Sequence, residues 1–404
     1  MSPRVREIQQ IVATTDVHSA LGQTDGMLSH LSGLRGHSLI ADCGDFFEGT
    51  GYYQLGKGSL EREILTRLYD VLVPGNHGWP HYFEDDLHPI TICANAVSEA
   101  DGHPLFERVR IVRVQGRRVA VTAVIGPQAF NVIPADQRAG HHVTDPATAL
   151  REVMLTHHHL VDAWIVLSHS GLDADMKLAA ACPFIDVIFA GHCHTPTQAP
   201  SRIGDILVVK GRELGIGYAY AEPVAHGWAA AMADFPTTGP VPAALAPLAE
   251  RIDSIGRQLA EDLGALAEPW TDGMLDRRNL LTHIVGRLHT GLGADAVIVN
   301  ESALRATVLA DRLTLEDLMA IEPFGNQLVH ATVPEPFADN LQGLLEDLTH
   351  REGPMATAPT PLPDGARTVL TTNYLADTFL GGRTHQAGIR LTDAVLHTLT
   401  EETL

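Results

Sequence analysis

Short apolar runs that end abruptly in polar side chains are the feature that most constrains the fold of this chain. Runs of this kind, nearly continuous in apolar residues, suit strands buried on both faces of an α/β sheet whose helices cover both sides. The segment 58–70 has the pattern of such a helix. In α/β sheets, polar side chains at the ends of strands form the sites. The five runs are IVATTDVH (11–18), SLIADCGD (38–45), VLVPGNH (71–77), AWIVLSHS (163–170) and IDVIFAGHCH (185–194).

A change in sequence pattern divides the chain. Its 404 residues exceed one typical hydrophobic core, so two domains are expected. From Pro240 to about Glu268, leucine and isoleucine recur at spacings of three and four, which predicts one long amphipathic helix. Beyond it, strands are predicted at 295–300, 328–333 and 368–373, with a helix after Pro336 and a Pro-rich loop at 354–366. We therefore predict a first domain at 1–238, a linker helix at 239–269 and a second domain at 270–404.

Charge and cysteine usage exclude several classes of protein. A net charge of -21 disfavours a nucleic-acid polymer or an anionic membrane as partner, because no basic stripe is present to neutralise phosphates. The N-terminal segment lacks the apolar run of a secretion signal, and no run reaches the roughly 20 apolar residues of a membrane helix. These patterns predict a cytoplasmic protein. Four scattered cysteines without a CxxC pair are predicted to be reduced thiols, namely Cys43, Cys93, Cys182 and Cys193.

The polar clusters together offer a set of metal ligands. Carboxylate oxygens, imidazoles and an amide oxygen suit Mn, Fe, Zn or Co better than Ca. Two such cations that share a bridging carboxylate activate a water between them. Any one of these residues alone is more simply a strand-end cap, but five clusters in succession favour a metal site. The candidates are Asp16, His18, Asp45, Asn76, His77, His169, His192 and His194.

The order of these clusters resembles a known family. The series is D-x-H (16–18), G-D-x-x-x-G (44–49), G-N-H (75–77), S-H (168–169) and G-H-x-H (191–194). It is similar to the calcineurin-like metallophosphoesterases, and within them to the 5'-nucleotidase family. The resemblance implies a mixed α/β and α+β fold, in which a four-layer α/β/β/α metallophosphoesterase domain is joined by a long helix to a smaller α/β/β/α substrate-binding domain.

The resemblance also implies roles for the clusters. The expected cofactors are two divalent metal ions, drawn from Mn, Zn, Fe, Co or Mg. A hydroxide bridging them would attack phosphorus in line, without a covalent phosphoenzyme, and His77 would stabilise the charge developing on the phosphoryl oxygens. The first ion would be held by Asp16, His18 and His194, and the second by Asn76, His169 and His192, with Asp45 bridging the two.

Two residues beside this set have other interpretations. Asp42 either orients a metal ligand from behind or caps the end of its strand. Cys193 lies between two imidazoles, but alternate residues of an extended segment share a face, so its thiol is expected to point away from them. We interpret Cys193 as a small packing residue.

The second half of the chain carries counterparts of the family's substrate segments. NESALRA (300–306) resembles N-G-G-G-I-R, EPFGNQLV (322–329) resembles P-F-G-N, and NYLADTFLGG (373–382) resembles aromatic-x-A-N-G-G. The resemblance implies that two aromatic rings sandwich a planar base. Arg277 or Arg278, together with Arg305, would meet the anionic or glycosyl side of the substrate. The predicted substrate-binding residues are Arg277, Asn300, Arg305, Phe324, Tyr374 and Arg383.

The chain departs from the family pattern at two positions. Most 5'-nucleotidases carry an Asp three residues after the His of G-N-H, but this chain has Pro80 there, which leaves Glu84, Asp85 or Asp86 as a partner, or no partner at all. Arg383 stands where the family has an Asp that binds the ribose hydroxyls. A cation with fork geometry at that place suggests a nucleotide whose sugar is modified or bears an extra anionic group.

The leading prediction is a two-metal phosphomonoesterase that acts on a nucleotide-like phosphorylated small molecule. A second interpretation keeps the metals but changes the bond to a cyclic phosphodiester, a nucleotide diphosphate link or the sulfur ester of thiosulfohydrolases. A third is a non-catalytic binding or scaffold module. The third is disfavoured because such a module should have lost ligands, whereas all seven and His77 are present.

Overall fold

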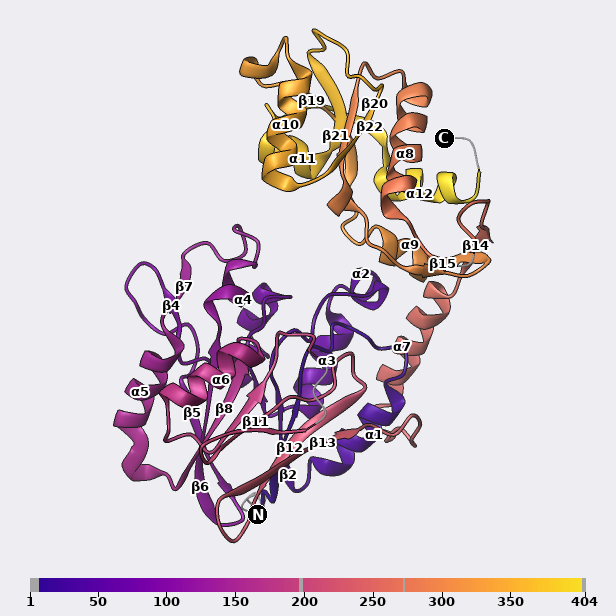
Figure 1. The fold of residues 1–404 in the computed structure, drawn as a ribbon. Coiled ribbons are helices and arrows are strands. Elements are labelled where there is room, and N and C mark those ends of the chain that lie inside the picture. Colours follow the sequence, from indigo (N-terminus) through magenta and orange to yellow (C-terminus); the bar gives the residue numbers. More distant parts are fainter. Residues whose placement is uncertain (1–6, 196–198, 272, 402–404) are drawn as a thin grey trace. The chain divides into compact units, whose positions relative to one another are not determined.

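The computed structural model describes residues 7–195, 199–271 and 273–401, with the side chains of residues 383 and 384 left out (Figure 1). The chain forms two compact units, Met1–Ile255 and Gly256–Leu404. The division falls inside helix α7 (Ala246–Leu259), which is shorter than the predicted linker helix at 239–269. The apolar spacing continues to Leu263, but residues Asp262–Ala265 form strand β14 because they pair with β18 (Arg312–Thr314).

The first unit contains two mixed sheets that pack face to face. Strands β1, β2 and β3 run parallel, as do β6, β8, β9 and β11. One sheet has the order β13-β12-β1-β2-β3 and the other the order β10-β11-β9-β8-β6-β5. Their bounds are β1 Gln10–Thr14, β2 Ser38–Asp42, β3 Val71–Leu72, β5 Val109–Val114, β6 Arg117–Ile125, β8 Ala163–His169, β9 Val187–Ala190, β10 Ser201–Ile203, β11 Ile206–Val209, β12 Gly217–Pro223 and β13 Trp228–Asp234.

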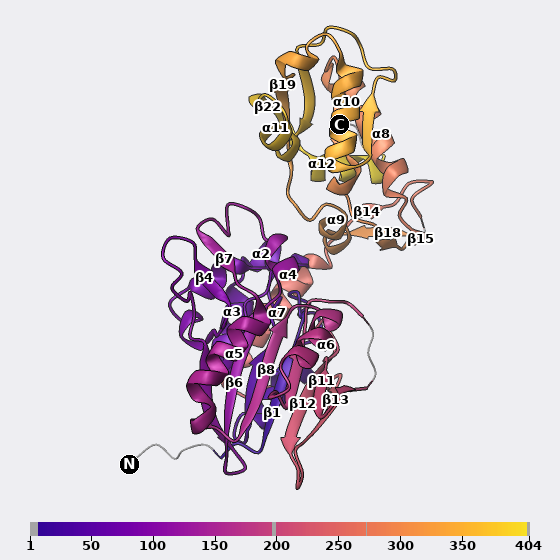
Figure 2. The ribbon, with the colours of Figure 1, turned by 60° about the vertical axis from the view of Figure 1, so that its left-hand side comes forward.

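Helices cover the outer faces of both sheets. Alternate side chains of the central strands, such as Ile11 and Ile165, meet between the sheets, while Val166 and Ile188 face helices α5 (Pro146–His157) and α6 (Leu172–Ala181). On the other side α1 (Asp25–Leu34) lies against β2, with α3 (Ser59–Leu68) beside it. Figure 2 shows α5 and α6 over the sheet that contains β6, β8 and β11. Burial on both faces explains the continuous apolar runs. The predicted helix at 58–70 corresponds to α3, and the predicted four-layer fold class is confirmed.

The loops that follow the strands have unusual backbone geometry. Asp16, Asp45 and His192 have φ of 50°, 56° and 76°, a left-handed conformation rare for residues with a side chain. Gly75 lies so close to Asp45 that a Cβ there would be 2.1 Å from its carboxylate. The left-handed residues include three of the predicted metal ligands, so the unusual backbone coincides with the polar clusters.

The second unit is built around one five-stranded sheet of order β20-β16-β21-β19-β22. Helices α8 (Arg277–Leu292) and α12 (Leu391–Leu399) pack on one face, and α10 (Leu341–Glu352) and α11 (Asn373–Phe379) on the other. The predicted strands correspond to β16, β19 and β21, and α10 is the predicted helix after Pro336. The strands are β16 Val297–Asn300, β19 Gln327–Thr332, β20 Met355–Ala358, β21 Thr368–Thr372 and β22 Arg383–Arg390.

One sequence expectation for the second unit was wrong. Residues Met355–Ala358, within the predicted Pro-rich loop, form β20 and pair with β16. The prolines of this segment flank the strand, and β20 is at the edge of the sheet, where proline is tolerated. Within the described ranges no helix has both the length and the apolar character needed to cross a membrane.

Candidate active site

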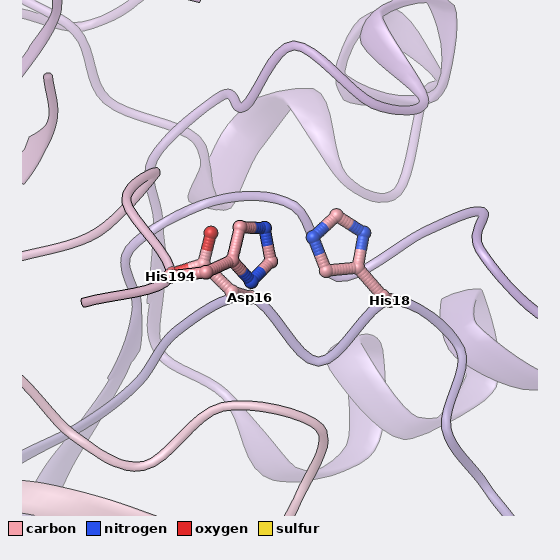
Figure 3. A group of neighbouring side chains, drawn as sticks. All are labelled: Asp16, His18 and His194. Carbon is pink, nitrogen blue, oxygen red and sulfur yellow. The ribbon is translucent and has the colours of Figure 1, made fainter. Parts of the chain in front are cut away.

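Three predicted ligands of the first ion converge in the structure. The ligand atoms of Asp16, His18 and His194 all lie within 4.8 Å of one another. Figure 3 shows the three side chains gathered at one point, although they come from the loops after β1 and β9. The rings of His18 and His194 stack with centroids 5.5 Å apart. Residues separated by more than two thirds of the first unit's sequence therefore meet at one spot.

A second group gathers beside the first. Asp45, His169 and His192 place their ligand atoms within 4.8 Å of one another. Nε2 of His169 also lies 3.0 Å from Oδ1 of Asn76. Asp45 reaches both groups, because its Oδ1 is 3.3 Å from Nε2 of His169 and its Oδ2 is 3.8 Å from Nε2 of His18. The structure thus brings together all seven predicted ligands with one carboxylate between two sets.

The chemistry of this donor set fits divalent cations. Nδ1 of His169 lies 2.8 Å from the carbonyl oxygen of Cys43, and a ring nitrogen beside a carbonyl must donate. The neutral ring therefore keeps its lone pair on Nε2, which faces the oxygens of Asp45 and Asn76, where a shared cation would be bound. Nε2 of His18 is buried without a hydrogen-bond partner among the described residues. Burial also lowers the pKa of His18 to about 4, which keeps the imidazole neutral. A neutral, buried and unpartnered imidazole nitrogen is a suitable ligand for a cation.

Buried carboxyls hold the surrounding turns. Asp42 accepts hydrogen bonds from Oγ1 of Thr14 at 2.6 Å and from the backbone nitrogen of Gly44 at 2.9 Å. These bonds favour the strand-end cap over the other interpretation of this residue. Burial raises the pKa of Asp42 to about 8.

Glu213 is a residue near the metal site that no motif indicated. It contacts Nδ1 of His194 and so orients its ring.

The partner of His77 lies where the sequence analysis did not place it. Nδ1 of His77 is 3.0 Å from Oε2 of Glu48, in the G-D-x-x-x-G loop. Burial opposes the charge on His77, but the hydrogen bond to Glu48 outweighs it and raises the pKa of the ring. Glu84 and Asp86 instead pair with Arg62, at 2.9 and 2.7 Å. The acidic segment 84–86 therefore does not supply the partner of His77. Glu48, from another loop, takes the place of the Asp that the family has at the position of Pro80.

A pocket of about 420 Å³ lies within the second unit. It contains five of the six predicted substrate residues, and of the two arginines left open it is Arg277 that lines it, since Arg278 borders a different depression. Arg383 is in β22, and its backbone pairs with that of Ala331 in β19. The side chain of Arg383 lies outside the described residues. The lining residues are Arg277, Asn300, Ser302, Ala303, Arg305, Phe324, Asn326, Glu352 and Tyr374.

Two aromatic rings of this pocket are open to solvent. Phe324 is 53% exposed and Tyr374 is 42% exposed, and both line the same pocket. The guanidinium of Arg305 lies 5.4 Å from the centre of the Phe324 ring. Sequence reasoning missed Ser302 and Glu352, whose side chains hydrogen-bond to each other at 3.0 Å. Only Ser302 falls within a matched segment, so no motif pointed to Glu352.

Curated proteins similar in sequence are phosphoesterases by name. No family model matches the chain. It is 23% identical over 169 residues to a 5'-nucleotidase-related protein of Glossina morsitans morsitans, covering 39% of this chain and 30% of that protein. It is 21% identical over 393 residues to the trifunctional nucleotide phosphoesterase YfkN of Bacillus subtilis, covering 79% of this chain and 26% of that protein. The chain thus spans about a third or less of the length of these relatives.

Solved structures share the fold over nearly the whole chain. The 5'-nucleotidase precursor of Thermus thermophilus has a TM-score of 0.65 at 18% identity and covers 97% of this chain and 96% of its own. The 5'-nucleotidase of Candida albicans has a TM-score of 0.66 at 15% identity, with 98% of both chains covered. The sulfate thiohydrolase SoxB of Thermus thermophilus has a TM-score of 0.65 at 17% identity, over 96% of this chain and 80% of its own. Sequence likeness and fold agree with the motifs, because the chain is similar in sequence to 5'-nucleotidase-related proteins and shares the fold of solved 5'-nucleotidases.

Proposed function

We propose that the chain is a metal-dependent hydrolase that releases phosphate from a nucleotide-like small molecule. One observation carries this proposal: Asp45 lies between two groups of ligand atoms that come from loops far apart in sequence. Within each group the ligand atoms lie within 4.8 Å of one another. The names of two relatives, a 5'-nucleotidase-related protein and a nucleotide phosphoesterase, support the same reaction and substrate class.

Metal ions bound here would polarise the phosphoryl group and activate water. The first would be held by Asp16, His18 and His194, and the second by Asn76, His169 and His192, with Asp45 shared. Manganese or zinc suits this mixture of imidazole and carboxylate ligands.

His77 is the group that would contact the phosphoryl oxygens. Its ring is 4.9 Å from that of His18 and its side chain is 41% exposed, so it can reach a ligand at the edge of the metal site. Because Nδ1 faces Glu48, Nε2 is free to donate to an oxygen on which charge develops. Glu48 would hold the ring in this orientation, the part that the family gives to an Asp in the place of Pro80.

The pocket of the second unit would bind the nucleoside end of the substrate. Exposed aromatic rings such as Phe324 and Tyr374 recognise planar bases by stacking, which needs only the faces of the rings. The fold itself does not choose the bond that is cut, since a sulfate thiohydrolase shares it. We also propose a cytoplasmic location. A sugar-modified substrate is proposed because Arg383 stands where the family has an Asp that binds the ribose hydroxyls.

A substrate panel tests this function. Phosphate release should be measured with the metal-loaded full chain on mononucleotides, sugar-phosphorylated nucleotides, cyclic nucleotides, nucleotide diphosphates and p-nitrophenyl phosphate. We expect metal-dependent release from mononucleotides or their sugar-modified forms. If only cyclic nucleotides or nucleotide diphosphates were hydrolysed, the bond that is cut would be a phosphodiester or a diphosphate link instead of a phosphomonoester. If the metal-loaded chain released phosphate from none of the substrates, the proposed function would be contradicted.

A further inference from the structure

A carboxylate without a cationic partner occupies the pocket of the second unit. Glu352 is the last residue of α10 and lines the pocket. Its Oε2 accepts from Oη of Tyr374 at 2.9 Å, and its Oε1 accepts from Oγ of Ser302 at 3.0 Å and from Nδ2 of Asn300 at 3.4 Å. All of these donors are neutral. Within the described part of the chain Glu352 forms no ion pair.

Both arginines of the pocket are directed elsewhere. Nε of Arg277 donates to Oε1 of Glu301 at 3.1 Å, and Arg305 lies over the ring of Phe324. Among the described side chains, neither of these two arginines pairs with Glu352. An ionised carboxylate has about four acceptor positions, so Glu352 keeps the capacity to accept further hydrogen bonds from a ligand.

A second acceptor in the same pocket receives no hydrogen bond within the described part of the chain. Asn300 is only 3% exposed, and its Oδ1 is buried without a hydrogen-bond partner among the described residues. Its Nδ2 is already engaged, because it donates to Oγ of Ser302 at 2.7 Å. Buried acceptors are costly when unsatisfied, so this oxygen indicates that a donor arrives with the ligand.

We propose that Glu352 is a specificity-determining residue, which selects a ligand that presents adjacent neutral hydrogen-bond donors to the pocket beside Tyr374. The proposal rests on the proposed function and narrows its substrate class. In a nucleoside such donors are either the vicinal hydroxyls of ribose or the amino and imino groups of the base. An extra anionic group on that side would meet the carboxylate and be repelled, the opposite of what Arg383 alone predicts.

Nucleoside binding tests this proposal without requiring hydrolysis. Calorimetry on the full chain would give the Kd of adenosine, guanosine and uridine, of the 2'-deoxy and 3'-deoxy form of each, and of purine riboside, which lacks the amino group of the base. We expect the wild type to prefer the donor-rich forms by about tenfold or more, the size expected of a hydrogen bond to a charged group. Glu352→Gln should lose that preference, and Glu352→Asp should keep part of it.

Glu346→Gln is the matched control, because Glu346 lies on the same helix, is exposed and does not line the pocket. Loss of preference against the deoxynucleosides assigns the donors to the sugar, and loss against purine riboside assigns them to the base. The proposal is overturned if no nucleoside binds, if all bind equally, or if Glu352→Gln keeps every wild-type preference. Selective binding without phosphate release would instead contradict the proposed function alone.

Discussion

The two candidate sites of this chain are built on opposite principles. The metal site of the first unit gathers charged and imidazole side chains that are mostly buried, on turns with strained backbone at Asp16, Asp45 and His192. The pocket of the second unit exposes Phe324 and Tyr374 and leaves acceptors for a ligand. Coordination chemistry dictates residue type, whereas a binding pocket is satisfied by many residue combinations. The first site is therefore readable from motifs, whereas Glu352 of the second site belongs to none of them.

Removing the carboxylate of Asp45 should abolish the activity of the metal site while leaving the pocket of the second unit intact, and this is the largest effect that we expect. Asp45→Asn should lower phosphate release by at least about a thousandfold, because metal catalysis is worth several kcal/mol. Nucleoside affinity should stay unchanged, since the pocket belongs to the other unit. Metal analysis, turnover and calorimetry measure the three properties, thermal unfolding checks the fold, and Asp101→Asn, at an exposed position, is the control. Unchanged turnover would remove the metal assignment altogether.

His77→Asn should affect rate but not metal content. Losing one group that stabilises developing charge lowers kcat by about a hundredfold. The ions should remain, because His77 is in neither predicted ligand set. Rapid-mixing kinetics and elemental analysis measure both. If metal were lost in proportion to rate, His77 would instead be a ligand, consistent with its place beside His18 and Asp45.

Phe324→Ala tests base stacking in the pocket of the second unit. If the exposed ring stacks on a base, the substitution should weaken nucleoside binding by about 1 to 3 kcal/mol. The effect should fall on KM, with metal content unchanged. Met274→Ala removes another exposed apolar side chain of the same unit that does not line the pocket. Equal nucleoside affinities in the wild type and both variants would argue against stacking.

Glu48→Gln should have the smallest effect. A neutral amide retains one hydrogen bond to His77 but loses its charge, so kcat should fall by about three- to tenfold with KM unchanged. Glu84→Gln is matched to it, because Glu84 contacts His81 rather than His77. A larger loss in Glu84→Gln than in Glu48→Gln would return the partner role to the acidic segment.

The sequence was most informative where residue chemistry is exacting. The apolar runs with polar ends predicted the strands of the first unit and the clusters that meet after them, and the family resemblance sorted seven of these residues into ligand sets. The linker helix was predicted too long, because helical spacing alone does not show that Asp262–Ala265 has a partner strand.

Contacts between distant segments could not be read in the same way. Glu48 reaches His77 across 29 residues, and Glu352 reaches Tyr374 across 22. Neither carboxylate belongs to a periodic pattern, and each acts only through the turn or helix end that places it. The left-handed backbone of Glu48, with φ of 62°, is a property of the folded loop rather than of its composition.

Measuring metal content and activity on the same samples tests whether this chain is a hydrolase that depends on two divalent metal ions. The purified full chain should be analysed for divalent metals, stripped with a chelator, reloaded with Mn or Zn, and assayed for phosphate release from mononucleotides at each stage. We expect about two ions per chain, loss of turnover on stripping and recovery on reloading. Full turnover by a chain that binds no divalent metal would contradict the account.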